Sequence, residues 1–325
     1  MNEPAFCEYL FSKNVNQNQA RIFINHLQEL QKILDTDDID ALPRGSILQY
    51  TENLVTEDAN AVLDVLRALL HYGNFIKNYD YVAEVLDIAE AYNAMDTLYE
   101  RVAEQFGTTT RDKIFANIKL PPLGVDPETK CEVTKIVIQR LEDTLGEAKT
   151  IELLAPCLHG RPVEPKDREE FLRLGDIDAF LELKHHELVD RFHQHQQRGT
   201  VEWAQYVDDA VVAYAANTPT ISPGIREGDL IISTKIPYQI KAMLDANELR
   251  MKRYYACYCP WVRGAINDGT ENEISANFCH CSAGFTKKYW DFIFDQPVKV
   301  QPIETALTGA THCKFAVQIP KEYQK

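Results

Sequence analysis

The chain has 325 residues, and 34 Lys and Arg against 49 Asp and Glu give it a formal net charge of −15. Apolar residues make up 45% and charged residues 26%, a balance with which a chain of this length can bury a core without disulfides or metals. The acidic balance argues against a nucleic-acid partner, because proteins that bind the phosphate backbone need a basic surface.

The sequence also lacks the patterns of a membrane-spanning segment and of a secretory signal. No apolar run reaches the ~18 residues of a membrane span, which argues against a membrane partner. Residues Met1 to Pro4 lack the basic and apolar regions with which a secretory signal begins. We therefore expect a cytoplasmic protein, and at about 150 residues per domain its length predicts two domains.

The first part of the chain is predicted to be helical. Apolar residues recur at helical spacing within residues 23–34, 56–72 and 79–106. The stretch Leu120-Pro121-Pro122-Leu123-Gly124 would stop a helix. We place a boundary there, which gives a helical N-terminal region over residues 1–120 and a second domain over residues 121–325.

The second domain is predicted to begin with helices over residues 126–217, the first of them opened by Asp126 and Pro127. From Gly228 onward, short β-branched runs predict strands, with helical segments near residues 237–248 and 287–294. The predicted strands cover residues 229–234, 253–259, 274–281, 298–304 and 313–319. We therefore predict an α+β fold whose residues 229–320 are mostly strands of an antiparallel sheet.

Eight cysteines give the most specific chemical signal. Five of them lie in the last part of the chain, and two close pairs stand out among these five. A long chain without a secretory signal that clusters its cysteines indicates metal or thiol chemistry in a reducing compartment. The eight are Cys7, Cys131, Cys157, Cys257, Cys259, Cys279, Cys281 and Cys313.

The two Cys-x-Cys pairs predict a metal site. Residues two apart on a strand point to the same face, so Cys257 and Cys259 would present their thiols together, as would Cys279 and Cys281. The turn signal at residues 267–269 would pair the two strands and place four thiols on one face. This arrangement predicts zinc or an iron–sulfur centre with these four cysteines as ligands.

Other interpretations of the same cysteines stay open. A flat hairpin separates the four sulfurs, so Cys313 is a possible replacement ligand. The thiols could instead be small buried hydrophobic groups, a cross-strand disulfide, or the lining of a ligand pocket.

A thiol nucleophile would need a base within hydrogen-bond reach. On a regular strand His280 points away from its neighbouring cysteines, so it would serve a thiol from another element, and Cys157 is a candidate. Arg263 follows Cys259 closely and could clamp a carboxylate. With Ser282, these residues form the predicted ligand-binding set.

A histidine-rich segment offers a second possible metal set. His186, Asp190 and His193 recur at the spacing of one helix face. The segment is highly polar, which favours a solvated helix face.

The motifs of the C-terminal part resemble a known group. Residues 257–263 and 278–285, with the tail at 297–317, resemble the C-terminal signature of a bacterial group named for the L-2-amino-thiazoline-4-carboxylate hydrolase-like domain. The tail is also similar to the 4-vinyl reductase domain, a small-molecule-binding α+β module whose cysteines are suspected metal ligands in some members. The resemblance covers roughly residues 228–320 and implies helices around an antiparallel ligand-binding sheet.

Three functions follow from these observations. The first is a protein that binds a small molecule or a metal at a cysteine-lined site on the C-terminal sheet. The second is a hydrolase of a C–N bond in a small cyclic carboxylate substrate, with Cys279 or Cys281 as nucleophile or ligand. The third is a helical interaction protein whose cysteines are purely structural.

Overall fold

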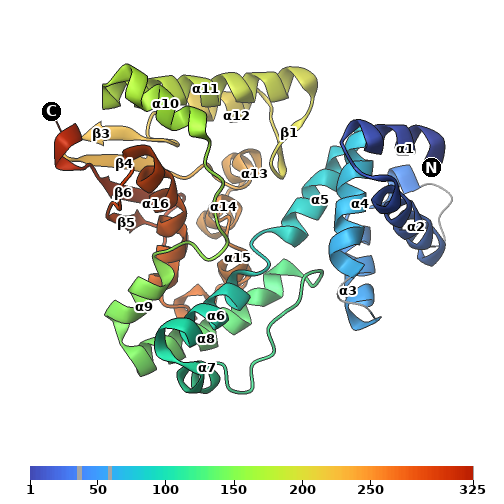
Figure 1. The fold of residues 1–325 in the computed structure, drawn as a ribbon, viewed down its shortest axis with the longest axis horizontal. Coiled ribbons are helices and arrows are strands. Elements are labelled where there is room, and N and C mark those ends of the chain that lie inside the picture. Colours follow the sequence, from blue (N-terminus) through green and yellow to red (C-terminus); the bar gives the residue numbers. More distant parts are fainter. Residues whose placement is uncertain (35–38, 58–60, 325) are drawn as a thin grey trace.

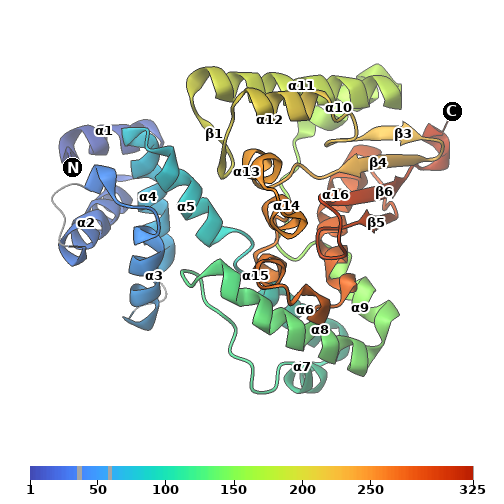
Figure 2. The same ribbon diagram turned by 180° about the vertical axis from the view of Figure 1, so that it is seen from behind.

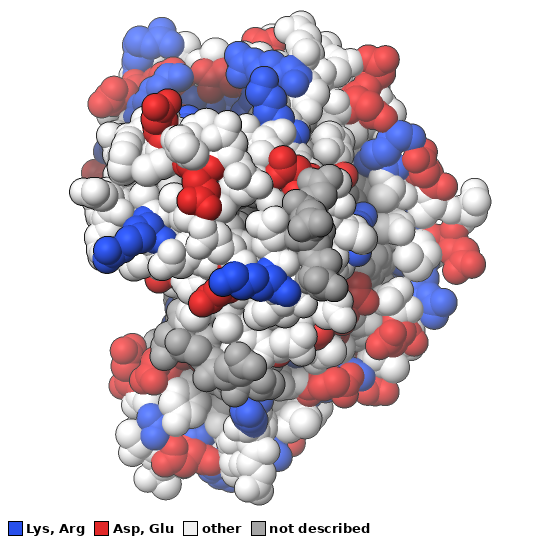
Figure 3. Space-filling model, turned by 90° about the vertical axis from the view of Figure 1, so that its right-hand side faces the viewer, with Lys and Arg blue, Asp and Glu red and all other residues white. Residues whose placement is uncertain are grey.

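Helices dominate the computed structural model, which describes residues 1–34, 39–57 and 61–324 (Figure 1). A four-stranded antiparallel sheet accompanies them, so the predicted α+β class is confirmed. No helix in these described ranges combines the length and apolar character that crossing a bilayer requires. Acidic and basic side chains are interspersed on the face drawn in Figure 3.

The N-terminal helices pack around a core of their own and lie to one side of the molecule (Figures 1 and 2). Phe6, Leu69 and Tyr72 are among its buried residues. Asn16 and Asn78 cap two of the helices with their side-chain oxygens. The elements are α1 (Glu3–Ser12), α2 (Gln17–Ile33), η1 (Ile39–Ala41), α3 (Ser46–Glu57), α4 (Ala61–Ile76) and α5 (Tyr79–Ala89).

The helix predicted over residues 56–72 is divided between α3 and α4, and residues 58–60 lie outside the described part. The one predicted over residues 79–106 is two helices, α5 and α6 (Ala94–Phe106). Ala91 between them has a φ of 43°, a left-handed conformation that a continuous α-helix excludes.

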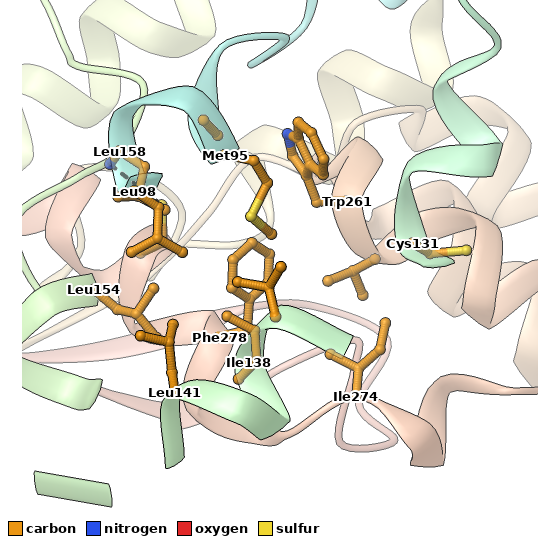
Figure 4. Packing of buried hydrophobic residues seen from close by; sticks show 14 of the residues in the cluster. Met95, Leu98, Cys131, Ile138, Leu141, Leu154, Leu158, Trp261, Ile274 and Phe278 are labelled. Carbon is orange, nitrogen blue, oxygen red and sulfur yellow. Dashed lines mark hydrogen bonds between the residues drawn. The ribbon is translucent and has the colours of Figure 1, made fainter. Parts of the chain in front are cut away.

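A second core joins the middle of the chain to its C-terminal part. Met95 and Leu98 of α6 pack with Leu154, Trp261 and Phe278 (Figure 4). The hydrophobic clusters divide between Ile88 and Ala94, whereas the domain boundary at residue 120 stays a prediction. The remaining elements here are α7 (Thr108–Ile114), η2 (Pro127–Lys130), α8 (Cys131–Leu145) and α9 (Glu147–Leu154).

Three helices and a short hairpin follow, and the helices lie across the top of Figure 1. They are α10 (Pro165–Leu174), α11 (Ile177–Arg198) and α12 (Asp209–Ala216), with β1 (Val201–Glu202) paired to β2 (Gln205–Tyr206). The hairpin interrupts the run of helices predicted over residues 126–217. His186, Asp190 and His193 are exposed on α11, so this face is solvated.

The sheet has the strand order β3-β4-β6-β5, and every pair in it is antiparallel. Its strands are β3 (Ile225–Glu227), β4 (Leu230–Thr234), β5 (Val300–Glu304) and β6 (Lys314–Gln318). Helix α16 (His280–Phe294) packs its Trp290 and Phe294 against the sheet residues Phe315 and Val317. The strands predicted at residues 229–234, 298–304 and 313–319 are confirmed.

The two predicted strands that carry the Cys-x-Cys pairs are wrong, and within residues 229–320 helical residues outnumber strand residues. The elements between β4 and α16 are α13 (Ile240–Asp245), α14 (Leu249–Ala256), α15 (Pro260–Asp268), η3 (Glu271–Glu273) and η4 (Ala276–Cys279). The residues predicted to form the hairpin turn instead form the C-terminal end of α15, where Gly269 has a φ of 75°. Short apolar runs do not distinguish a buried helix from a strand by periodicity, which explains the error.

Candidate metal centre

Two thiols and an imidazole meet where the end of α9 approaches the start of α16. The ligand atoms of Cys157, His159 and Cys281 all lie within 4.8 Å of one another. Cys157 and His159 follow α9, and Cys281 lies in the first turn of α16. The backbone N–H of Leu158 donates to the Cys281 sulfur at 3.4 Å, so the two segments are joined at the site itself.

A glycine lets these two segments approach so closely. Gly284 lies three residues after Cys281 on the same helix face. A Cβ atom at this position would lie 2.1 Å from the carbonyl oxygen of Ala155 and 2.7 Å from the nitrogen of Cys157. Any larger residue must therefore push α16 away from the loop that carries Cys157.

Arg101 of α6 holds the loop from the other side. Its guanidinium donates to the carbonyl oxygens of Leu153 and Pro156, both at 2.6 Å, and to that of Cys157 at 3.2 Å. Leu158 is buried in the core beneath, beside Leu98 (Figure 4). The loop is thus fixed by hydrogen bonds and by packing, which gives the three ligand atoms a defined geometry.

The two thiols of the group form a coupled pair. A hydrogen bond with Cys281, followed by contacts with His159, lowers the pKa of Cys157. The same hydrogen bond, followed by burial, raises the pKa of Cys281 well above its ordinary value. The thiol of Cys157 therefore loses its proton more readily than the thiol of Cys281.

A narrow pocket of about 40 Å³ adjoins the group, with room for a few water molecules. His159, Cys281 and Ser282 line one part of it. All eight cysteines are free, and four further ones line this same pocket: Cys257, Cys259, Cys279 and Cys313. Helix ends and the start of β6 bring them together, rather than a hairpin.

The four Cys-x-Cys residues do not form a second compact ligand group. Among the described residues, the three-ligand group found within 4.8 Å contains Cys281 alone of these four. Burial raises the pKa of Cys257 to about 12, and it also raises the pKa of Cys259 and of Cys279. Their role as a metal set therefore stays a prediction, and in this arrangement they are neutral thiols.

The other predicted site residues lie in different places. His280 is the first residue of α16, and burial lowers its pKa, but it neither belongs to the three-ligand group nor lines the narrow pocket. The imidazole beside Cys157 is that of His159, which is not among the predicted site residues. The sequence Cys157-Leu158-His159 contained a signal for this site, because cysteine and histidine are both metal-binding residue types. Arg263 lines a separate, larger cavity.

The donor set fits a soft or borderline metal ion. Zinc takes thiolate sulfur at ~2.3 Å and imidazole nitrogen at ~2.0–2.1 Å, which places neighbouring ligand atoms roughly 3.7 Å apart. The separations here need only small side-chain movements to reach that spacing. Two cysteines and one histidine would leave the fourth tetrahedral position open.

Comparisons with protein-family models, with curated proteins and with solved structures found no match. The resemblance of residues 228–320 to the hydrolase-like group therefore stays a prediction from its motifs. The function has to be argued from the geometry of the site.

Proposed function

We propose that this protein binds a zinc ion through Cys157, His159 and Cys281. The observation that carries the proposal is the convergence of these three ligand atoms within 4.8 Å, from segments far apart in the chain. The fixed loop and the close approach at Gly284 support it, because metal sites are held by the groups behind their ligands.

Zinc is favoured over an iron–sulfur centre by the composition of the group. Fe–S clusters are held mostly by four cysteine thiolates, whereas this group supplies two sulfurs and one nitrogen. Zinc accepts such mixed sets. A reducing compartment such as the cytoplasm would keep both thiols available as ligands.

Zinc stoichiometry and affinity test the proposal. Purified reduced protein is titrated with zinc in competition with a chromophoric chelator. We expect one tight equivalent. Cys157→Ser, His159→Ala and Cys281→Ser should each weaken binding by more than roughly a hundredfold, because losing even an outer partner of a metal ligand costs about 10–100-fold.

The matched controls are Cys7→Ser, which lies on α1, and Cys259→Ser, which lies in the narrow pocket but outside the three-ligand group. Both should keep the affinity of the unmodified protein. Loss of binding in Cys259→Ser with retention in Cys157→Ser would contradict the proposal and favour the Cys-x-Cys set. Absence of any tight zinc would favour purely structural cysteines.

The lowered pKa of Cys157 favours a second candidate, a nucleophilic thiolate with His159 as its neighbouring base. Attack on a small cyclic carboxylate substrate would be the hydrolase version of this function. Alkylation of Cys157 by iodoacetamide in metal-free protein tests it. A thiolate alkylates at a rate that changes little from pH 6 to 8, whereas an ordinary thiol reacts roughly tenfold faster per pH unit.

A further inference from the structure

A cavity of about 450 Å³ lies between the N-terminal helices and the C-terminal part, apart from the cysteine pocket. Glu84 and Asp87 of α5 line one side of it, and Tyr238, Tyr254 and Arg263 line the other. This volume falls in the range of cavities that hold small organic ligands. The narrow pocket beside the cysteines is an order of magnitude smaller.

The floor of the cavity is a network of contacts around Arg263. Its guanidinium donates to Asp87 at 2.6 Å, and the Tyr238 hydroxyl donates to the same oxygen at 2.7 Å. The guanidinium carbon lies 4.8 Å from the ring centre of Tyr238 and 5.6 Å from that of Tyr254. The Nε atom is buried and has no hydrogen-bond partner. The ion pair with Asp87 therefore holds the Arg263 guanidinium in the floor of the cavity.

The remaining charge of the lining is negative. Two arginines and four acidic residues line the cavity, so their formal sum is 2 − 4 = −2. Asp87 is neutralised by Arg263. The other three acidic residues of the lining are Glu84, Asp126 and Glu128. None of them makes an ion pair with a residue in the described ranges.

These carboxylates are held in place by uncharged donors. Glu84 accepts from the backbone N–H groups of Gly45 and Leu48, both at 3.0 Å. Glu128 accepts from the Tyr254 hydroxyl and, at 3.1 Å, from the Asn267 side chain. Such contacts fix the carboxylates without cancelling their charge, which leaves a preorganised negative field in a partly enclosed space.

The approach of α15 to η2 fixes this wall of the cavity. A Cβ atom on Gly264, next to Arg263, would lie 1.9 Å from the carbonyl oxygen of Glu128. The absence of a side chain on Gly264 therefore lets α15, which carries Arg263, pack closely against the backbone of Glu128. The wall also carries Tyr254 and Tyr255, whose rings meet edge to face at 5.1 Å.

We propose that this cavity binds a small organic amine. Its ammonium group would lie among the carboxylates of Glu84, Asp126 and Glu128, and its apolar body against the faces of Tyr254 and Tyr255. This site is independent of the proposed zinc site. It also changes the role predicted for Arg263, which here anchors Asp87 and the tyrosines rather than a ligand carboxylate.

Three ligands of similar shape but different charge test whether the cavity prefers a cation. Phenethylamine, the neutral isostere 2-phenylethanol and the anion phenylacetate are titrated into the full-length protein at low salt, with binding followed by calorimetry. We expect phenethylamine to bind roughly tenfold or more tighter than the alcohol, because a hydrogen bond to a charged group is stronger than a neutral one. Phenylacetate should bind weakest. Equal binding of amine and alcohol, tighter binding of phenylacetate, or no binding of phenethylamine would overturn the proposal.

Variants test the location. Glu84→Gln and Glu128→Gln should each weaken phenethylamine binding roughly tenfold and leave 2-phenylethanol unchanged. The matched control is Glu182→Gln, an exposed residue of α11 outside the cavity. Ala242→Trp, which fills the cavity from α13, should abolish binding without removing any charge. Unchanged amine binding in a folded Ala242→Trp protein would place the amine elsewhere and overturn the proposal.

Discussion

The backbone N–H of Leu158 donates to the sulfur of Cys281 at 3.4 Å, across 123 residues of sequence. This bond joins the loop after α9 to the first turn of α16, and the three proposed zinc ligands lie on either side of it. An N–H group directed at sulfur favours the thiolate that binds metal, and here it opposes the hydrogen bond with Cys157 and the burial that raise the pKa of Cys281. The site is therefore built by the packing of two distant segments.

Replacing Gly284 with alanine should separate these segments. The added Cβ atom would meet the carbonyl oxygen of Ala155, so we expect the free energy of unfolding to fall by about 1–3 kcal/mol. Zinc affinity should fall roughly tenfold or more as Cys281 moves from Cys157. Gly264→Ala creates a comparable clash with Glu128 away from the site, so it should destabilise the fold but leave zinc affinity intact. Chemical denaturation and chelator competition measure the two quantities.

Arg101→Met should weaken the site through the loop. It removes three hydrogen bonds to carbonyl oxygens at the end of α9, so we expect a stability loss of about 2 kcal/mol and a roughly tenfold loss of zinc affinity. The control is Arg140→Met, because Arg140 donates to the carbonyl oxygens of Ile114 and Ala116, away from the site. Equal effects of both variants on zinc affinity would show that Arg101 has no positioning role.

Zinc affinity should depend on pH around neutrality. The hydrogen bond with Cys157, followed by burial, raises the pKa of Cys281, so zinc must displace a proton from this thiol because zinc binds thiolates. Affinity should therefore rise roughly tenfold per pH unit, with about one proton released per zinc. Calorimetry in buffers of different ionisation enthalpy measures that proton. No proton release would show that the pair is already fully deprotonated.

Lys130 should destabilise the protein at neutral pH. It is fully buried, its Nζ atom has no hydrogen-bond partner, and burial lowers its pKa from 10.5 to about 8. Between pH 8 and 10.5 the unfolded chain holds this proton and the folded chain does not, so stability rises with pH there. Below pH 8 both states hold the proton, and the folded state bears the full cost.

Lys130→Met should therefore increase the free energy of unfolding at pH 7 by about 3 kcal/mol and remove this group's contribution to the rise above pH 8. The exposed Lys119 gives the matched control, because Lys119→Met should change neither quantity. Denaturant unfolding at pH 7 and pH 10 measures both. A Lys130→Met protein less stable than the unmodified one at pH 7 would contradict the prediction.

Helix boundaries with strong local signals could be predicted from the sequence. Asp126 caps η2 with Pro127 at its first position, as expected. The strands around Cys257 and Cys279 could not be predicted correctly, because their apolar runs are short and buried on several sides. Tertiary packing determines the secondary structure of these segments.

The cysteine pocket was predictable in part. The sequence pattern indicated that the C-terminal cysteines converge, and five of them do line one pocket. The pairing of Cys281 with Cys157 and His159 was not predictable, because it depends on the close approach at Gly284, which leaves no periodic signal. Arg263 illustrates the same limit, since its partner Asp87 lies 176 residues away.

X-ray absorption spectroscopy of the zinc-loaded protein tests the central claim most directly. We predict a first shell of two sulfur atoms at about 2.3 Å and one imidazole nitrogen at about 2.0–2.1 Å, with a light-atom ligand in the fourth position. The Cys259→Ser protein should give the same shell. A shell of four sulfur atoms, or one without sulfur, would contradict a site built from Cys157, His159 and Cys281.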